Sequence, residues 1–332
     1  MHYQQPFSMT SNQFVQEILS GNRAVLSKAI TLVESSLEEH QKIAQKIIAQ
    51  CLPYSGKSIR IGITGVPGVG KSTFIDALGK YITSQGKKLA VLAIDPSSQV
   101  SGGSILGDKT RMEELSVDEN AFIRPSPSSG SLGGVARSTR ETIILCEAAG
   151  FEIIFVETVG VGQSETDVHK LVDFFLLLML AGAGDELQGI KRGIMEMADA
   201  IIINKADGDN ITKAKAARSQ YAMALHLFPP TDSGWIPKVE ICSALTKDGI
   251  DRAWKIVEEH HSLVQSKGFF QKKRQEQSKF WMYETIDNDL KNLFYRNENI
   301  SKLLPQLEKN VMEGKISSFA GASMLITEFQ KK

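Results

Sequence analysis

Hydrophobic and polar residues follow two different patterns along the chain. Over residues 11–50, apolar positions recur every three or four residues, as at Leu26, Ile30 and Val33, which predicts amphipathic helices. From residue 59 onward, short apolar runs are separated by helical stretches. This second pattern is typical of βαβ units, so it predicts a parallel sheet.

Seven apolar runs predict strands between residues 59 and 244. They read IRIGIT, KLAVLAID, AFIRP, EIIFVET, FFLLLML, AIIINKAD and KVEICSA. Nearly all end in polar residues, and the carboxyl edge of an open α/β sheet is where ligands bind. The predicted fold is therefore α/β, with a mainly parallel β-sheet flanked by helices and helical extensions at both ends.

Composition fits an ordinary globular protein, with 42% hydrophobic and 23% charged residues. A chain of 332 residues suggests about two domains. We expect an N-terminal helical extension over residues 1–55, the α/β domain over 56–265 and a C-terminal helical extension over 266–332. The longest apolar stretch, FFLLLMLAGAG from Phe174, is shorter than the ~20 residues that cross a bilayer, so a buried strand is the better interpretation.

Charge and cysteine content limit which binding partners and which cellular compartment we expect. Basic and acidic residues number 38 each, so no overall field attracts nucleic acid or an anionic membrane. The cysteines Cys51, Cys146 and Cys242 stand far apart, which disfavours disulfides and thiolate zinc sites and favours a reducing compartment. The N-terminus lacks the pattern of a signal or transit peptide, so a cytoplasmic protein is expected.

A phosphate-binding motif follows the first predicted strand. The stretch GVPGVGKS matches G-x-x-x-x-G-K-[ST] and precedes a helical pattern. Its glycines let backbone N–H groups point at phosphates, and the helix N-terminus adds partial positive charge. Lys71 is predicted to span the β and γ phosphates, Ser72 to bind Mg²⁺ and Thr73 to lie near the α-phosphate. The predicted phosphate-binding residues are Gly65, Val66, Pro67, Gly68, Val69, Gly70, Lys71, Ser72 and Thr73.

The tetrapeptide NKAD, after the strand AIIIN, predicts the choice of base. The Asp207 carboxylate can accept two hydrogen bonds from guanine, whereas adenine offers no such pair of donors. Lys205 would lie along the base, next to Asn204. The next strand ends in Ser243, Ala244 and Leu245, which completes the predicted guanine site. We therefore expect GTP and GDP as ligands.

Carboxylates at other strand ends suit a metal ion and the attacking water. Glu157 ends the strand EIIFVET and could hold Mg²⁺ or orient water, while the N–H of Gly160 could sense the γ-phosphate. Asp95 ends the second strand and Asp108 lies in the following loop, both suited to Mg²⁺. The predicted catalytic residues are Lys71, Asp108 and Glu157, and the predicted metal ligands are Ser72, Asp95, Asp108 and Glu157.

Several longer motifs occur in order along the chain. They read AIDPSSQVSGGSILGDKTRM, SPSSGSLGGVAR, ETVGVGQSE, AGAGDELQGIKRGIMEMAD and NKADGDN. With the phosphate-binding motif, they make residues 20–265 resemble the MeaB/ArgK family of GTPases, which are chaperones of adenosylcobalamin-dependent acyl-CoA mutases, above all methylmalonyl-CoA mutase. The resemblance implies a P-loop GTPase whose hydrolysis of GTP gates cobalamin loading or protection of the mutase.

The resemblance also implies roles for two segments outside the nucleotide motifs. Residues 184–192 would form a mobile switch that relays the nucleotide state to the mutase, and the helices over 280–329 would form a dimerisation arm. A homodimer is therefore expected. From the residues alone, the first segment is only a polar loop after a buried strand, and an apolar stripe in the second could equally belong to an intrachain core.

Other functions stay open on the sequence. One is an ArgK-type kinase linked to amino-acid transport, against which NKAD argues because it disfavours ATP. Another is a GTPase that inserts metal into an enzyme, although the six histidines are scattered rather than clustered. A third is a mutase-binding scaffold without catalysis, against which the complete phosphate motif argues.

Overall fold

The computed structural model describes residues 9–95, 112–127, 132–158, 164–182, 192–229 and 231–331. Contacts divide the chain into two units, Met1–Gln275 and Glu276–Lys332. Each unit is described separately below. The domain boundaries predicted at residues 55 and 265 stay predictions.

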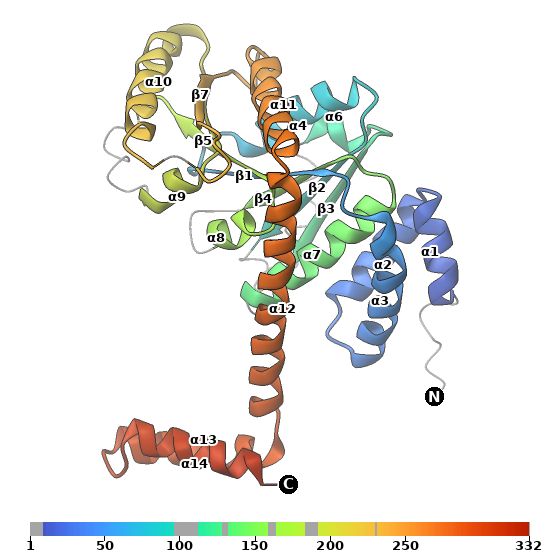
Figure 1. Cartoon of the computed structure of the whole chain (residues 1–332), viewed down its shortest axis with the longest axis vertical. Helices are drawn as coiled ribbons and strands as arrows, with labels where there is room; N and C mark the ends of the chain where they lie inside the picture. The colour runs from blue at the N-terminus through green and yellow to red at the C-terminus, as the bar shows by residue number, and fades with distance from the viewer. Residues whose placement is uncertain are drawn as a thin grey trace. The chain divides into compact units, whose positions relative to one another are not determined.

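The first unit is built around one sheet of seven parallel strands (Figure 1). The strand order is β3-β2-β4-β1-β5-β6-β7. The strands are β1 (Ile59–Gly65), β2 (Leu89–Asp95), β3 (Ala121–Pro127), β4 (Ile153–Thr158), β5 (Phe174–Leu180), β6 (Ala200–Asn204) and β7 (Lys238–Ile241). The predicted α/β fold with a parallel sheet is confirmed. Strand β6 ends before the predicted AIIINKAD run does, because Lys205 has a left-handed backbone with φ 59°.

Helices cover both faces of this sheet. Those lying wholly in the first unit are α1 (Ser11–Leu19), α2 (Arg23–Glu34), α3 (Glu38–Cys51), α4 (Lys71–Thr83), α6 (Glu113–Ser116), α7 (Leu132–Ala148), α8 (Ser164–His169), α9 (Arg192–Met197), α10 (Ile211–Leu225) and α11 (Ile250–Ser266), with short 3-10 turns at Leu52–Tyr54 and Gly208–Asn210. Alternation along β1 separates the faces: Ile61 and Ile63 join the core beneath α4, whereas Gly62 faces Val168 of α8.

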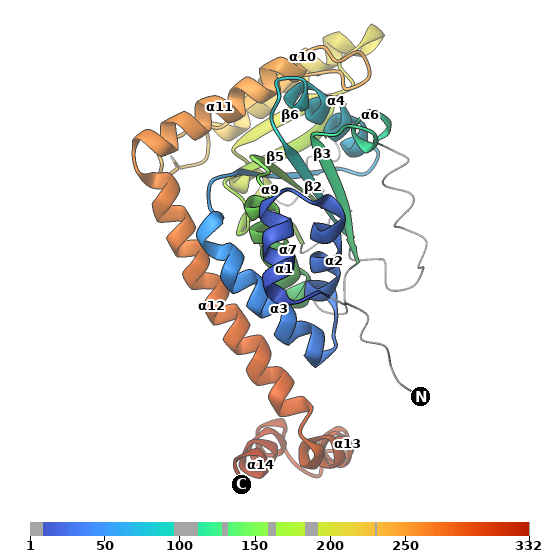
Figure 2. The same ribbon diagram turned by 90° about the vertical axis from the view of Figure 1, so that its right-hand side faces the viewer.

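The N-terminal helices α1, α2 and α3 form a small bundle that packs on α7. Figure 2 shows this bundle in blue beside α7 and the strand β3. Helix α7 begins at Leu132, inside the motif SPSSGSLGGVAR. No helix in the described parts of the chain is both long and apolar enough to cross a membrane.

An ion cluster closes the amino-terminal edge of the sheet. Arg60, at the start of β1, donates two hydrogen bonds of 3.0 Å to the Glu147 carboxylate of α7. Arg274 donates to both oxygens of Asp173, at 2.5 and 2.6 Å, and the backbone N–H of Arg60 donates to the same carboxylate at 2.8 Å. Burial alone would raise the pKa of Asp173, but the two guanidinium groups outweigh that effect and lower it.

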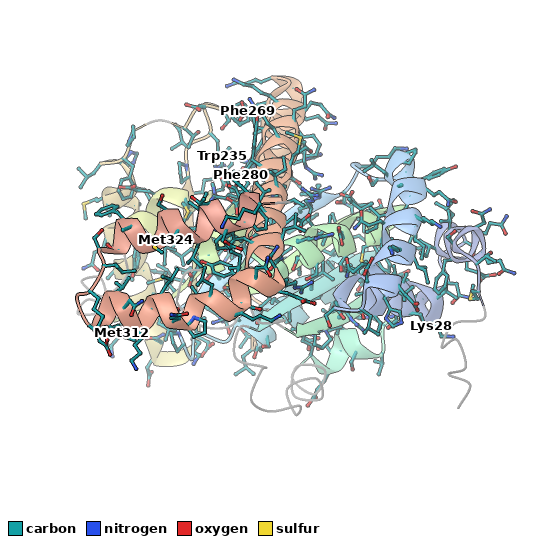
Figure 3. All side chains as sticks on the ribbon, turned by 90° about the horizontal axis from the view of Figure 1, so that it is seen from below. Lys28, Trp235, Phe269, Phe280, Met312 and Met324 are labelled. Carbon is teal, nitrogen blue, oxygen red and sulfur yellow. The ribbon has the colours of Figure 1, made fainter. Side chains whose placement is uncertain are left out.

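The second unit is helical. It contains the later part of α12 (Phe269–Tyr295), then α13 (Glu298–Met312) and α14 (Ser318–Gln330), the last two packed on each other. Its core is small and comprises Ile300, Leu307 and Leu325. Met312 and Met324, labelled in Figure 3, are 80% and 50% exposed on this helix pair.

Candidate functional site

The phosphate loop joins β1 to α4 at the carboxyl edge of the sheet. Gly68 and Gly70 have left-handed φ values of 74° and 87°, which non-glycine residues rarely adopt. Helix α4 begins at Lys71, and no side chain caps its first turn. The N–H groups of that turn are therefore available to an anion.

Lys71 lies at the mouth of this loop, half-buried. Its Nζ donates to the carbonyl of Gly65 at 3.0 Å. Burial lowers the pKa of Lys71, while the negative charges of Glu157 and Glu165 act in the opposite direction. The ammonium group therefore lies within electrostatic reach of both carboxylates.

Glu165 was not predicted from the sequence. It occupies the first turn of α8 and is 1% exposed. No spacing rule marks it, since its neighbour Thr166 and the rest of the turn are also polar. Burial of a charged side chain near the phosphate loop is the signal, and burial becomes visible only in the fold.

The predicted metal side of the site is described in part. Glu157 is 4% exposed on β4, opposite Ile63 of β1 and Ala93 of β2. Ser72 and Thr73 follow Lys71 in the first turn of α4, with Ser72 half-buried.

Other predicted residues lie outside the described parts of the chain. Asp95 ends β2, but its side chain is not among the described ones, and Asp108 and Gly160 lie outside the described residues. Residues 184–191 of the predicted switch segment do too, and its last residue, Arg192, begins α9.

The NKAD motif contacts the phosphate loop directly. The Asn204 side chain is buried, donates through Nδ2 to the Val69 carbonyl at 2.9 Å and accepts from the Ala244 N–H at 3.0 Å. Lys205 extends its ammonium group to the Gly68 carbonyl at 2.8 Å. Asn204 and Lys205, which are predicted to lie at the base, therefore hold the backbone of the loop that is predicted to bind phosphates.

The carboxylate of Asp207 is oriented by the loop after β7. Ser243 donates its hydroxyl to Asp207 Oδ2 at 2.5 Å, and the same hydroxyl oxygen accepts from the Thr246 N–H at 3.1 Å. Ala244 is buried beside Asn204, while Leu245 is 79% exposed. Two segments about 40 residues apart therefore form one polar corner, as guanine recognition requires.

The sheet, the glycine-rich loop after its central strand and the NKAD corner beside that loop define a P-loop GTPase. The chain belongs to the MeaB family, because the family model described as "Methylmalonyl Co-A mutase-associated GTPase MeaB" matches residues 26–299. It is therefore an enzyme that hydrolyses GTP. The predicted family and activity are confirmed.

Similar proteins come from distant organisms. "GTPase ArgK" of Escherichia coli is 46% identical over 95% of this chain and 96% of its own length. "Methylmalonic aciduria type A homolog, mitochondrial" of Mus musculus is 46% identical over 95% of this chain and 78% of its own length. A crystal structure described as "LAO/AO transport system kinase" is 38% identical, covers 99% of this chain and 100% of its own, and has a TM-score of 0.78.

Proposed function

We propose that this GTPase is a chaperone of an adenosylcobalamin-dependent acyl-CoA mutase, above all methylmalonyl-CoA mutase. GTP hydrolysis would gate the loading of cobalamin into the mutase or the protection of the loaded enzyme. The observation that carries this proposal is the match of residues 26–299 to a family described as mutase-associated. The mouse relative, whose name refers to methylmalonic aciduria, supports the same substrate class for the partner enzyme.

The proposed mechanism requires positive charge around the phosphates of the nucleotide. Lys71 would approach the β and γ phosphates, while the backbone N–H groups from Gly65 to Thr73 surround them. The oxygen donors Ser72 and Glu157 suit Mg²⁺, which prefers hard oxygen ligands, and Asp95 and Asp108 would complete that set. Bound Mg²⁺ would supply positive charge against the phosphate oxygens.

Water is the acceptor of the phosphoryl group in this proposal. Glu157 or Asp108 would orient the water, and the N–H of Gly160 would sense whether the γ-phosphate is present. Loss of that phosphate would be relayed through residues 184–192 to the mutase. The burial of Glu157 near Lys71 supports a carboxylate held in place before nucleotide arrives.

The test is a binding experiment with the purified full-length protein and a purified methylmalonyl-CoA mutase. We expect the two to associate with an affinity that differs between a non-hydrolysable GTP analogue and GDP, and we expect the mutase to accelerate GTP turnover. An acyl-CoA enzyme without cobalamin is the control. Absence of association with any cobalamin-dependent mutase would overturn the proposal while leaving the GTPase activity intact.

We also propose a homodimer formed by the second unit. Its three-residue core supports this, because many large apolar side chains of the unit remain exposed. They include Met282, Tyr283, Leu290, Leu293, Met312, Phe319, Met324 and Ile326. Sedimentation equilibrium should give twice the 36.5 kDa chain mass. The double change Phe319→Ser and Met324→Ser should shift the protein toward monomer, and a wild-type monomer would refute the dimer.

A second candidate function is phosphorylation of a transport component, favoured by the description of the similar solved structure as a transport system kinase. The two candidates differ in the acceptor of the γ-phosphate. With γ-labelled GTP, the chaperone proposal expects label only in inorganic phosphate. Label on a protein or small molecule would favour the kinase.

A further inference from the structure

A cavity of about 530 Å³ lies between α2, α6 and the edge strand β3. Strands β2 and β4 separate β3 from β1, so this cavity is distinct from the nucleotide site. Figure 2 shows α2 running beside β3 at this edge of the sheet. The volume falls within the roughly 300–1,000 Å³ of small-molecule sites.

Two arginines, Arg23 and Arg124, line the cavity. Arg23, the first residue of α2, donates to the backbone carbonyls of Glu119 and Ala121. Arg124, from β3, donates to the hydroxyls of Ser27 and Thr31, each at 3.3 Å. The arginines come from different elements, so the fold rather than local sequence brings them together.

The cavity carries a net positive charge. Arg124 also pairs with Glu34 of α2, and that carboxylate is the one acidic group among the described residues of the lining. Two guanidinium groups against one carboxylate leave one positive charge. The Nε of Arg124 is buried and has no hydrogen-bond partner among the described residues. Because a buried donor without an acceptor is costly, a small shift of the Arg124 side chain toward the cavity would let an anion accept from it.

The edge of the sheet excludes an added strand as the occupant. The N–H of Leu89 donates to the carbonyl of Asn120, so even-numbered residues of β3 bond to β2 and odd-numbered residues face outward. Pro125 faces outward and has no N–H, and the outward carbonyl of Ala121 is taken by Arg23. Proline and a capped carbonyl block strand addition, which leaves a small molecule.

Apolar side chains line the rest of the cavity. Leu115 of α6 and Phe122 and Ile123 of β3 contribute to the lining, and each is less than 10% exposed. A guanidinium group binds carboxylates and phosphates through charge-assisted hydrogen bonds. We propose that this cavity binds a small organic anion, with its carboxylate or phosphate at Arg124 and its apolar part against β3 and α6.

Helix α6 connects this cavity to the helix that begins at the phosphate loop. Asp76 of α4 accepts the N–H groups of Glu114 and Leu115 at 3.3 and 2.9 Å. Leu115 also packs on Gly79 of α4, where a Cβ would come within 2.5 Å of its side chain. An anion that holds α6 in this position also stabilises its contact with α4. Anion binding should therefore raise the affinity for GDP, and GDP should equally raise the affinity for the anion.

The test titrates full-length protein, saturated with GDP to occupy the phosphate loop, with acetate, pentanoate, inorganic phosphate and phenyl phosphate. Protein NMR or calorimetry measures binding. We expect pentanoate or phenyl phosphate to bind with a Kd at or below about 5 mM, and more tightly than acetate or inorganic phosphate. The two pairs of probes distinguish a carboxylate from a phosphate ligand. No binding by any of the four would overturn the proposal.

Three variants locate the binding. The pair Arg124→Gln with Glu34→Gln removes both charges together, so that no buried charge is left unpaired. Ser27→Leu fills the cavity and leaves the charges in place. Each should weaken binding at least about tenfold, whereas Lys28→Gln, an exposed neighbour on α2 labelled in Figure 3, should not.

Wild-type affinity in both cavity variants would overturn the site. The link through α6 is measured separately, as the GDP affinity with and without pentanoate or phenyl phosphate, in the wild type relative to Ser27→Leu, so that competition at the phosphate loop cancels. An increase of about fivefold is expected. An unchanged GDP affinity would overturn that link. Neither result depends on a mutase, so both are distinguishable from failure of the proposed function.

Discussion

The two edges of the sheet use polar residues in opposite ways. At the amino edge, Arg60, Asp173 and Arg274 pair with one another inside the protein, and their hydrogen bonds join β1 to α12. At the carboxyl edge, Lys71 and Asn204 bond to backbone carbonyls of the phosphate loop. Ion pairs between side chains stabilise the fold at the amino edge. Hydrogen bonds from side chains to the loop backbone at the carboxyl edge instead fix the shape of a surface that can bind a ligand.

The amino edge should be the more sensitive to loss of a single charge. Asp173→Ala leaves two buried guanidinium groups, Arg60 and Arg274, to share the single carboxylate of Glu147, which should lower the free energy of unfolding by about 3–5 kcal/mol. Urea denaturation measures the change. Asp251→Ala, the same substitution at an exposed position on α11, should change it by less than about 0.5 kcal/mol. If Asp173→Ala lowered the free energy of unfolding as little as Asp251→Ala does, a structural role for the cluster would be contradicted.

At the carboxyl edge, Lys71→Ala should damage catalysis rather than folding. Losing the ammonium group that faces the developing charge should reduce GTP turnover about 10²–10³-fold. The free energy of unfolding should change little, because Lys71 is only half-buried and its ammonium group donates to a loop carbonyl, that of Gly65. Lys213→Ala, at an exposed position on α10, is the matched control. Retained turnover would remove Lys71 from its proposed role.

Asp207→Asn tests the base corner of the same edge. Replacing the carboxylate by an amide removes an acceptor for guanine and disturbs the Ser243 hydrogen bond. GTP affinity should fall roughly ten- to hundredfold, as for loss of a charge-assisted hydrogen bond. Fluorescent-nucleotide titration measures it, with Asp209→Asn, exposed two residues away, as the control. Equal losses in both variants would point to general damage rather than to base recognition.

Acid should affect the amino edge through His169. Burial and the nearby charge of Lys273 lower the pKa of His169 to about 4, from 6.5 in the unfolded chain. The unfolded state therefore binds more protons between these values, so this contribution is complete above pH 6.5 and is lost as pH falls toward 4. Between pH 7 and 5 the free energy of unfolding should fall by on the order of 1 kcal/mol less in His169→Gln than in the wild type. His226→Gln, at an exposed position, should behave like the wild type. Parallel pH profiles for His169→Gln and the wild type would contradict the assignment.

The pattern of apolar runs and motifs predicted the parallel sheet and the place of the NKAD motif at its carboxyl edge. Strands β2, β4, β5 and β6 are mostly apolar, and the motifs place Asn204 at the end of β6, with Lys71 and Asp207 in the sequence just beyond strand ends. Parallel strands bring such ends together, so the sequence of motifs was enough to predict one site. The contact between Lys205 and Gly68 could not be predicted, since it depends on a left-handed backbone at Lys205.

The ion cluster and the edge cavity could not be predicted from local pattern. Arg60, Glu147, Asp173 and Arg274 are spread over more than 200 positions, and only the folded sheet brings them together. Arg23 and Arg124 are likewise about 100 residues apart. Such contacts depend on tertiary packing, for which a single sequence carries no periodic signal. Glu165 belongs to the same class, because its burial rather than its spacing distinguishes it.

The hydrogen bonds from Asn204 and Lys205 to the phosphate loop have an entropic consequence. The loop carbonyls of Val69 and Gly68 are already fixed by the base-side motif, so the glycine-rich backbone has less freedom left to lose when a nucleotide binds. A residue proposed to recognise the base would thereby also pre-organise the phosphate loop. One connected scaffold would then serve both ends of the nucleotide, and a change that loosens either end would raise the entropic cost of ordering both.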